Sequence, residues 1–396
     1  MIRICSVEIC EIRLPLVHSF ETSFGSTATR RIILLRVSSA DCCGHGECTA
    51  PEDPFYNHET TDTAWHILSD FVIPRLLGRE LQHAGDAAAI LKPIRGNRMA
   101  AATLETALWD LEARRLGVPL HALIGGVRRE IPCGVSIGIQ PTIPELLAKV
   151  RTEVAAGYRR VKIKIKPGWE IEPVRAIRSE FPSLLLMADA NSAFRLDDLP
   201  LFLKLDDYGL MMIEQPLAHD DILDHAKLQQ EIRTPICLDE SICSFEHARQ
   251  AIESGSCRII NVKLGRVGGY AEALKINDYC VRNGVPLWCG GMLESGVGRA
   301  HNIALSTLAG FTLPGDVSAS RRYYAEDTIT PPVEVSSGGT ILVPESPGIG
   351  YTLDTERIGR ATVRRRGFSN SLPGKPQASA GGLTGFDSSG SPGLRT

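Results

Sequence analysis

The sequence has no apolar run near the roughly 20 residues that a membrane-spanning helix needs, and its first fifteen residues are broken by Glu8, Glu11 and Arg13. None of its eleven cysteines forms a Cys-x-x-Cys pair, and their odd number argues against a disulfide framework and for reduced thiols. The net charge of −3 gives no general attraction to nucleic acid or to a membrane surface. These absences favour a cytoplasmic protein with neither of those partners.

Cysteine is dense only in the segment 41–48, where Cys42, Cys43, His45 and Cys48 stand among glycines. No second ligand cluster follows at the spacing of a zinc finger. We therefore interpret this segment as a glycine-rich turn between strands and not as a zinc site.

The composition changes at the end of the chain. Residues 361–396 contain 16 Gly, Ser or Pro and few apolar residues, which predicts a disordered tail. Five of its residues are basic and one is acidic, so the tail is basic and the first 360 residues carry a net charge of −7.

Residues 126–330 alternate short β-branched runs with longer segments of helical period, which is typical of successive βα units. The pattern predicts an α/β fold, a (β/α)₈ TIM-type barrel with an irregular last unit. The expected strands are 132–139, 159–165, 184–190, 210–215, 235–239, 258–264, 286–290 and, weakly, 312–316.

Residues 1–125 do not follow this rhythm. Strand-like stretches at 2–13 and 31–38 precede helical segments near 60–77 and 98–116, which predicts an α+β capping domain to which a segment near 335–355 returns. The polar segments 16–29 and 51–60 are expected to be loops that close over an active site.

Charged residues stand at the ends of five successive predicted strands: Lys164, Asp189, Glu214, Asp239 and Lys263. The intervals of 25, 25, 25 and 24 residues each span one βα unit. Because a barrel delivers its strand ends to one rim, we expect these side chains to form a ring there.

The three carboxylates would repel one another unless a cation neutralised them, and an all-oxygen site suits Mg²⁺ better than zinc. Strict alternation places Lys162 and Lys164 on one face of their strand, beside the carboxylates, with Lys263 on the opposite side. A lysine works as a base only if its pKa falls, and Lys162 and Arg266 are the neighbouring cations expected to lower it. These residue types suggest abstraction of a proton next to a carboxylate, with a metal stabilising the developing charge.

The motifs that carry these residues resemble those of the enolase superfamily, muconate-lactonizing subgroup, and among them most closely the o-succinylbenzoate synthases and N-succinylamino acid racemases. They are Lys162-x-Lys164, Asp189-Ala190-Asn191, Glu214-Gln215-Pro216, Asp239-Glu240-Ser241, Lys263-x-Gly265-Arg266 and Gly290-Gly291-Met292-Leu293-Glu294. The resemblance covers about residues 1–355. One departure is His45, where relatives often carry Trp.

The resemblance implies a role for each of these positions. Asp189, Glu214 and Asp239 become Mg²⁺ ligands, with Mn²⁺ as an expected substitute, and Lys164 and Lys263 become the catalytic pair on the two faces of the substrate. The implied reaction is the dehydration of a cyclohexadiene carboxylate to o-succinylbenzoate in menaquinone biosynthesis, or racemisation of an N-acylamino acid at the same site.

The resemblance also implies surrounding residues. The segment 290–294, with Gly291, Met292, Leu293 and Glu294, would contact the succinyl group, and Ser136 would line the pocket. Lys162, Asn191, Glu240 and Arg266 complete the expected surroundings. We also expect a homo-oligomer.

Three other readings compete. Gly134-Val135-Ser136-Ile137-Gly138 matches the elbow of serine hydrolases, but its alternation predicts a strand and Pro141 and Pro144 delay the helix that an elbow needs. Gly296-Val297-Gly298 resembles part of a dinucleotide loop but lacks the third glycine. A barrel retained only for binding would make the lysines and carboxylates dispensable.

Overall fold

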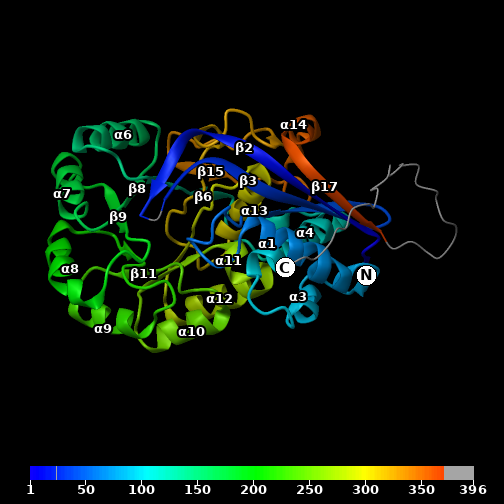
Figure 1. Cartoon of the computed structure of the whole chain (residues 1–396), viewed down its shortest axis with the longest axis horizontal. Coiled ribbons are helices and arrows are strands. Elements are labelled where there is room, and N and C mark those ends of the chain that lie inside the picture. The colour runs from blue at the N-terminus through cyan, green and yellow to red at the C-terminus, as the bar shows by residue number, and fades with distance from the viewer. Residues whose placement is uncertain (24, 370–396) are drawn as a thin grey trace, which may run out of the picture.

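The barrel strands form one parallel sheet in the computed structural model, which describes residues 1–23 and 25–369 (Figure 1). Seven strands follow one another in chain order around it. They are β7 (Gly134–Ile137), β8 (Arg160–Lys164), β9 (Leu185–Asp189), β10 (Ile213–Glu214), β11 (Ile236–Leu238), β12 (Ile259–Val262) and β13 (Leu287–Cys289). The predicted α/β barrel is thus confirmed.

The expected eighth strand at 312–316 is wrong as a regular strand. Pro314 has no N–H to donate to a ladder, and only an isolated bridge joins Cys133 to Gly315. The segment still lies between the first and last strands, because Gly134 donates to the Gly315 carbonyl at 2.7 Å and Asp316 donates to that of Cys289 at 2.8 Å.

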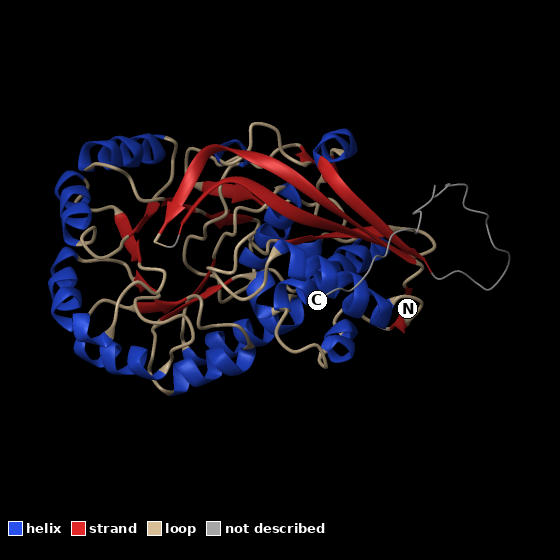
Figure 2. Cartoon of the chain, in the orientation of Figure 1, coloured by secondary structure: helices blue, strands red, loops and turns tan. Residues whose placement is uncertain are grey.

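Helices cover the outside of the sheet, as the coloured view shows (Figure 2). They are α6 (Ile143–Ala155), α7 (Ile171–Glu180), α8 (Leu199–Leu205), α9 (Leu223–Glu231), α10 (Phe245–Glu253), α12 (Tyr270–Asn283) and α13 (Gly296–Ser306), whereas the short α11 (Leu264–Val267) packs against the cap. Their ends follow local sequence signals: Thr142 and Ser244 cap the N-termini of α6 and α10, and Gly284 ends α12 in a left-handed conformation.

The cap is an antiparallel sheet packed on a long helix. Its strands lie in the order β17 (Thr362–Ser369), β2 (Ser6–Thr22), β3 (Gly25–Ser38), β4 (Cys43–Cys48), and α4 (Arg98–Leu116) packs against β3 and β4. Shorter elements complete it: β1 (Ile2–Arg3), β5 (Glu80–Leu81), α1 (Thr61–Ile67), a π-helical turn (Leu68–Val72), α2 (Ile73–Leu76), α3 (Asp86–Leu91) and α5 (Leu120–Leu123).

Three expectations for the cap are wrong. Residues 16–22 and 25–29 do not form a loop but belong to β2 and β3, which pair again where Phe20 lies opposite Thr27. The glycine-rich segment is strand β4, and its glycines permit close packing, since a Cβ at Gly44 would lie 2.1 Å from the Ala107 carbonyl oxygen of α4. The expected disorder from residue 361 is wrong for 361–369, because Ala361 ends a helix and Thr362–Ser369 form β17; residues 370–396 lie outside the described residues.

The 51–60 segment and the part of the chain after the barrel complete this region of the molecule. The segment 51–60 contains no helix or strand. After the barrel come β14 (Ile329–Thr330), β15 (Thr340–Leu342), β16 (Thr352–Leu353) and α14 (Thr355–Ala361). Between them the chain contacts the cap, because Ile349 donates its N–H to Asp110 of α4 at 2.7 Å.

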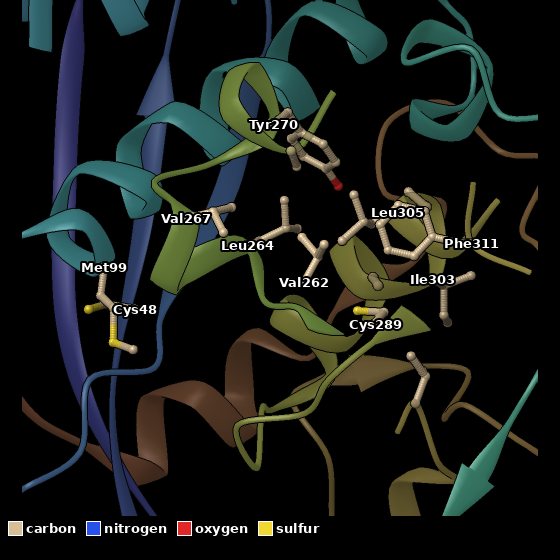
Figure 3. Close-up of a cluster of buried hydrophobic side chains, with 14 of the residues drawn as sticks. Cys48, Met99, Val262, Leu264, Val267, Tyr270, Cys289, Ile303, Leu305 and Phe311 are labelled. Atoms are coloured by element: carbon tan, nitrogen blue, oxygen red, sulfur yellow. The ribbon is translucent and has the colours of Figure 1, made fainter. Parts of the chain in front are cut away.

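One hydrophobic core joins the cap to the barrel. Figure 3 shows Cys48 and Met99 of the cap near Val262 and Leu264 of the barrel, all of them buried in the same cluster. Glu105 of α4 adds a polar link, since its carboxylate accepts hydrogen bonds from the N–H groups of Tyr270 and Ala271 at the start of α12. The cap is therefore held firmly over the rim of the barrel.

Candidate active site

The five charged residues predicted to form a ring are buried at one rim of the barrel. The strand register places Asp189 beside Lys164 on one side and beside Glu214 on the other. Asp239 and Lys263 follow the last residues of β11 and β12. All five are at most 7% exposed, so the structure brings the predicted set together in a place shielded from solvent.

Direct ion pairs connect the lysines to the carboxylates. Lys164 Nζ lies 2.6 Å from Asp189 Oδ2, and Lys263 Nζ lies 2.8 Å from Asp239 Oδ2. Lys162 Nζ lies 2.9 Å from Glu214 Oε2. Each of the three carboxylates therefore has a lysine as an immediate partner.

Asp316 is a further member of this cluster that the sequence analysis missed. Its carboxylate pairs with Lys162 at 2.8 Å and with Arg160 at 2.7 Å, and it accepts a hydrogen bond from the Ser136 hydroxyl at 2.9 Å. It ends the weak segment 312–316, where a carboxylate after an eighth strand would have been the available signal.

Burial and neighbouring charges both shift the pKa values of these groups. Burial alone would raise the pKa of Asp189, but Lys164 and Lys162 hold it below its ordinary range. Burial, together with the charge of Asp189, raises the pKa of Glu214. Burial would lower the pKa of Lys263, but Tyr56 and Glu240 raise it above its usual value. The expectation that the pKa of Lys263 is lowered is therefore wrong, because Tyr56 and the carboxylates of Glu240 and Glu214 outweigh the effect of burial.

The remaining predicted residues fall into two groups. Asn191 joins the centre, since its Oδ1 accepts from Lys164 at 2.6 Å and its Nδ2 donates to Glu240 at 2.8 Å. Arg266 donates to the Asp239 carboxylate and to the Tyr56 hydroxyl. Glu294 instead turns back on its own segment and accepts from the Met292 N–H at 2.9 Å.

A cavity of about 470 Å³ opens at this rim between barrel and cap. The barrel contributes the three lysines, Ser136, Asn191 and the segment Gly291, Met292, Leu293. The cap contributes Phe20 and Arg30 from the β2–β3 hairpin and Tyr56 from the 51–60 loop. Both segments that were expected to border an active site thus line it, although one is a hairpin.

The donor chemistry suits a hard divalent cation. Asp189, Glu214 and Asp239 offer carboxylate oxygens, and Glu240 Oε2 is a buried oxygen without a hydrogen-bond partner. Among residues 1–23 and 25–369 no three acidic, His or Cys side chains are arranged to hold an ion, and the lysines occupy the carboxylates instead. The residue types therefore fit Mg²⁺, which would have to displace these ammonium groups from the carboxylates.

Two of the three competing interpretations, the hydrolase elbow and the dinucleotide loop, do not fit the structure. Ser136 lies within β7 and is followed by 138–142, not by the helix that a nucleophile elbow requires. The N–H groups of Gly296 and Gly298 donate to Asp327 and Glu47, so carboxylates occupy the place where a phosphate would bind.

A barrel with carboxylates on three successive strand ends, flanked by lysines and covered by an α+β cap, defines the enolase superfamily, and the chain belongs to it. Residues 4–125 match the mandelate racemase / muconate lactonizing enzyme N-terminal domain, and residues 145–358 match the enolase C-terminal domain-like family.

Two relatives within this family show which of its members this chain resembles. The chain is 53% identical over 352 residues to an o-succinylbenzoate synthase of Geobacillus kaustophilus, which covers 89% of this chain and 94% of the relative. It is 48% identical over 369 residues to an N-succinylamino acid racemase of Thermus thermophilus, which covers 93% of this chain and 100% of the relative.

A solved structure of an enolase-superfamily member from Listeria innocua superposes with a TM-score of 0.90 at 42% identity, covering 93% of this chain and 100% of that one. The likeness thus spans cap and barrel together.

Proposed function

We propose that this chain is a Mg²⁺-assisted lyase that dehydrates 2-succinyl-6-hydroxy-2,4-cyclohexadiene-1-carboxylate to o-succinylbenzoate, a step of menaquinone biosynthesis. The observation that carries the proposal is that Lys164 and Lys263, from different strands, line one cavity together with carboxylates suited to a divalent ion. The names of the relatives above support this choice of substrate.

The residues divide the work as follows. Asp189, Glu214 and Asp239 would hold Mg²⁺, which would supply positive charge next to the substrate carboxylate. Lys164 acts as the base that removes the proton on the carbon beside that carboxylate, and the proton it gains passes to the departing hydroxyl group, which leaves as water. Lys263 keeps its ammonium on the opposite face and stabilises the charge that develops in the substrate.

The same site supports a second activity. Racemisation of an N-succinylamino acid needs a base on one face of the α-carbon and an acid on the other, and the two lysines supply them. The racemase among the relatives favours this alternative.

The site also suits a small carboxylate substrate. We propose that the protein acts on it in the cytoplasm and does so as a homo-oligomer. In the described part of the chain, no helix is both long and apolar enough to cross a membrane. Light scattering on the purified full chain tests the oligomeric state.

The test compares kcat/KM for the cyclohexadiene substrate with that for a panel of N-succinylamino acids, in wild type and in Lys263→Ala. We expect the highest value for the cyclohexadiene substrate, and we expect Lys263→Ala to lose racemisation more completely than dehydration. Turnover of N-succinylamino acids without turnover of the cyclohexadiene substrate would make racemisation the activity of this protein in place of dehydration. Turnover of neither class would contradict the proposal.

A further inference from the structure

Arg30 is a buried cation in the active-site cavity that has no acidic partner. It lies on β3 of the cap, is 4% exposed, and lines the same cavity as Lys164 and Lys263. Its Nη2 donates to the Thr49 carbonyl at 2.8 Å, whereas its Nε is buried without a hydrogen-bond partner. None of the ion pairs among the described residues includes Arg30.

Several other arginines of the described residues have acidic partners, whereas the buried Arg299, which also donates only to carbonyl oxygens, does not line this cavity. Arg31, the next residue on the same strand, binds both Glu11 at 2.6 Å and Asp62 at 2.9 Å. The buried guanidinium of Arg160 pairs with Asp316, and that of Arg322 pairs with Glu153. A buried charge is destabilising without an opposite charge nearby. The described residues supply no acidic group that pairs with Arg30.

The surroundings of Arg30 favour an anion. A guanidinium binds a carboxylate through two parallel N–H groups and does so most strongly where water is excluded. The acids of the cap that line the cavity, Glu52 and Asp53, are exposed on the 51–60 loop. Ser26, Thr27 and Thr29, from the same hairpin as Arg30, add hydroxyl groups to this side of the cavity.

We propose that Arg30 binds a second carboxylate of the substrate, the one at the far end of the succinyl chain, and thereby makes the site selective for dicarboxylates. This inference rests on the proposed function, in which the first carboxylate lies with the lysines of the barrel. The barrel lysines and the cap arginine then hold the two ends of one substrate, and the cap contributes directly to specificity.

The test measures binding and so needs no turnover. The dissociation constants of o-succinylbenzoate and of 2-butanoylbenzoate, which lacks the distal carboxylate, are measured by calorimetry with Mg²⁺ present. The variants are Arg30→Met, which removes the charge at similar length, Arg30→Lys, which keeps a charge, and Arg31→Met as the matched control outside the cavity.

We expect wild type to prefer o-succinylbenzoate by about tenfold to a hundredfold, as for a buried charge-assisted hydrogen bond. Arg30→Met should lose this preference while binding 2-butanoylbenzoate within about threefold of wild type, Arg30→Lys should retain part of it, and Arg31→Met should retain all of it. If Arg30→Met does not fold, the two ligands are compared in wild type alone. Equal affinities of wild type for o-succinylbenzoate and 2-butanoylbenzoate would overturn the inference.

Other outcomes separate the inference from the function. If wild type discriminates between the ligands and Arg30→Met discriminates equally well, Arg30 is not the recognition residue and the proposed function stands. If wild type binds neither ligand, both fail.

Discussion

Lys263 of the barrel donates a hydrogen bond to the hydroxyl of Tyr56 in the cap, 3.0 Å away. The two residues are 207 positions apart in the chain, and the contact places a residue of the 51–60 loop on one of the two proposed catalytic lysines. Arg266 donates to the same hydroxyl at 3.1 Å. The cap therefore takes part in orienting the reactive groups as well as in covering them.

Tyr56→Phe removes this hydroxyl while keeping the ring that lies 4.7 Å from Lys263 Nζ. We expect kcat for racemisation, which uses Lys263 in proton transfer, to fall about tenfold, the effect of losing one hydrogen bond to a charged group. Dehydration should fall less, because Lys263 acts there only through its charge. Steady-state kinetics on both substrates measure the ratio, and an equal loss in both would contradict a role in orienting Lys263.

Metal dependence gives a second prediction. EDTA should abolish activity and Mg²⁺ should restore it, while Asp239→Asn should raise the Mg²⁺ concentration for half-maximal rate by at least about tenfold. Asp41→Asn, a change at an exposed carboxylate of the cap, is the matched control. Full activity after exhaustive chelation would show that the carboxylates serve only the lysines.

Cys43 offers a prediction of pH dependence away from the active site. The hydrogen bond from His45, whose Nε2 lies 4.0 Å from the sulfur, lowers the pKa of the Cys43 thiol to about 7. The thiolate is the nucleophile, so alkylation by iodoacetamide should rise with pH, reach half its maximum near pH 7 and level off above it. Peptide mapping measures the rate at each cysteine.

His45→Phe should move the midpoint of Cys43 alkylation toward pH 9, the ordinary pKa of a thiol. A midpoint that stays near 7 in this variant would show that other groups, such as Arg36, set the reactivity.

Strand β17 predicts a difference between two truncations. It pairs with β2 along 362–369, and its Arg364 binds the buried carboxylate of Glu11 at 2.6 Å. A chain ending at residue 361 should melt about 5 °C or more below a chain ending at residue 369, because it loses a ladder of hydrogen bonds and a charge partner of a buried acid. Calorimetry that finds equal melting temperatures would mean that β17 adds no stability.

How far the sequence predicts this molecule depends on the kind of interaction. The barrel and the ring from Lys164 to Lys263 could be predicted, because a repeat of about 25 residues reports the βα unit directly. The strand β17 could not, since its composition is that of a disordered segment and it is ordered by pairing with β2, some 350 residues earlier. Tyr56 lies in a segment that was expected to border the site, but its contact with Lys263, 207 residues away, is not encoded in any local pattern.

The site assignments themselves stay predictions, and exchange of the substrate α-proton tests them most directly. The wild-type protein with Mg²⁺ is incubated in D₂O with an N-succinylamino acid of L configuration and, separately, with its D enantiomer, and loss of the α-proton signal is followed by NMR.

We predict that wild type exchanges both enantiomers and that Lys164→Ala loses exchange with one of them by about a thousandfold or more. Lys166→Ala, which changes a half-buried lysine two residues along the same segment, should exchange both normally. Near-normal exchange of both enantiomers by Lys164→Ala would contradict the account, because the proton would then leave without the base on which the mechanism depends.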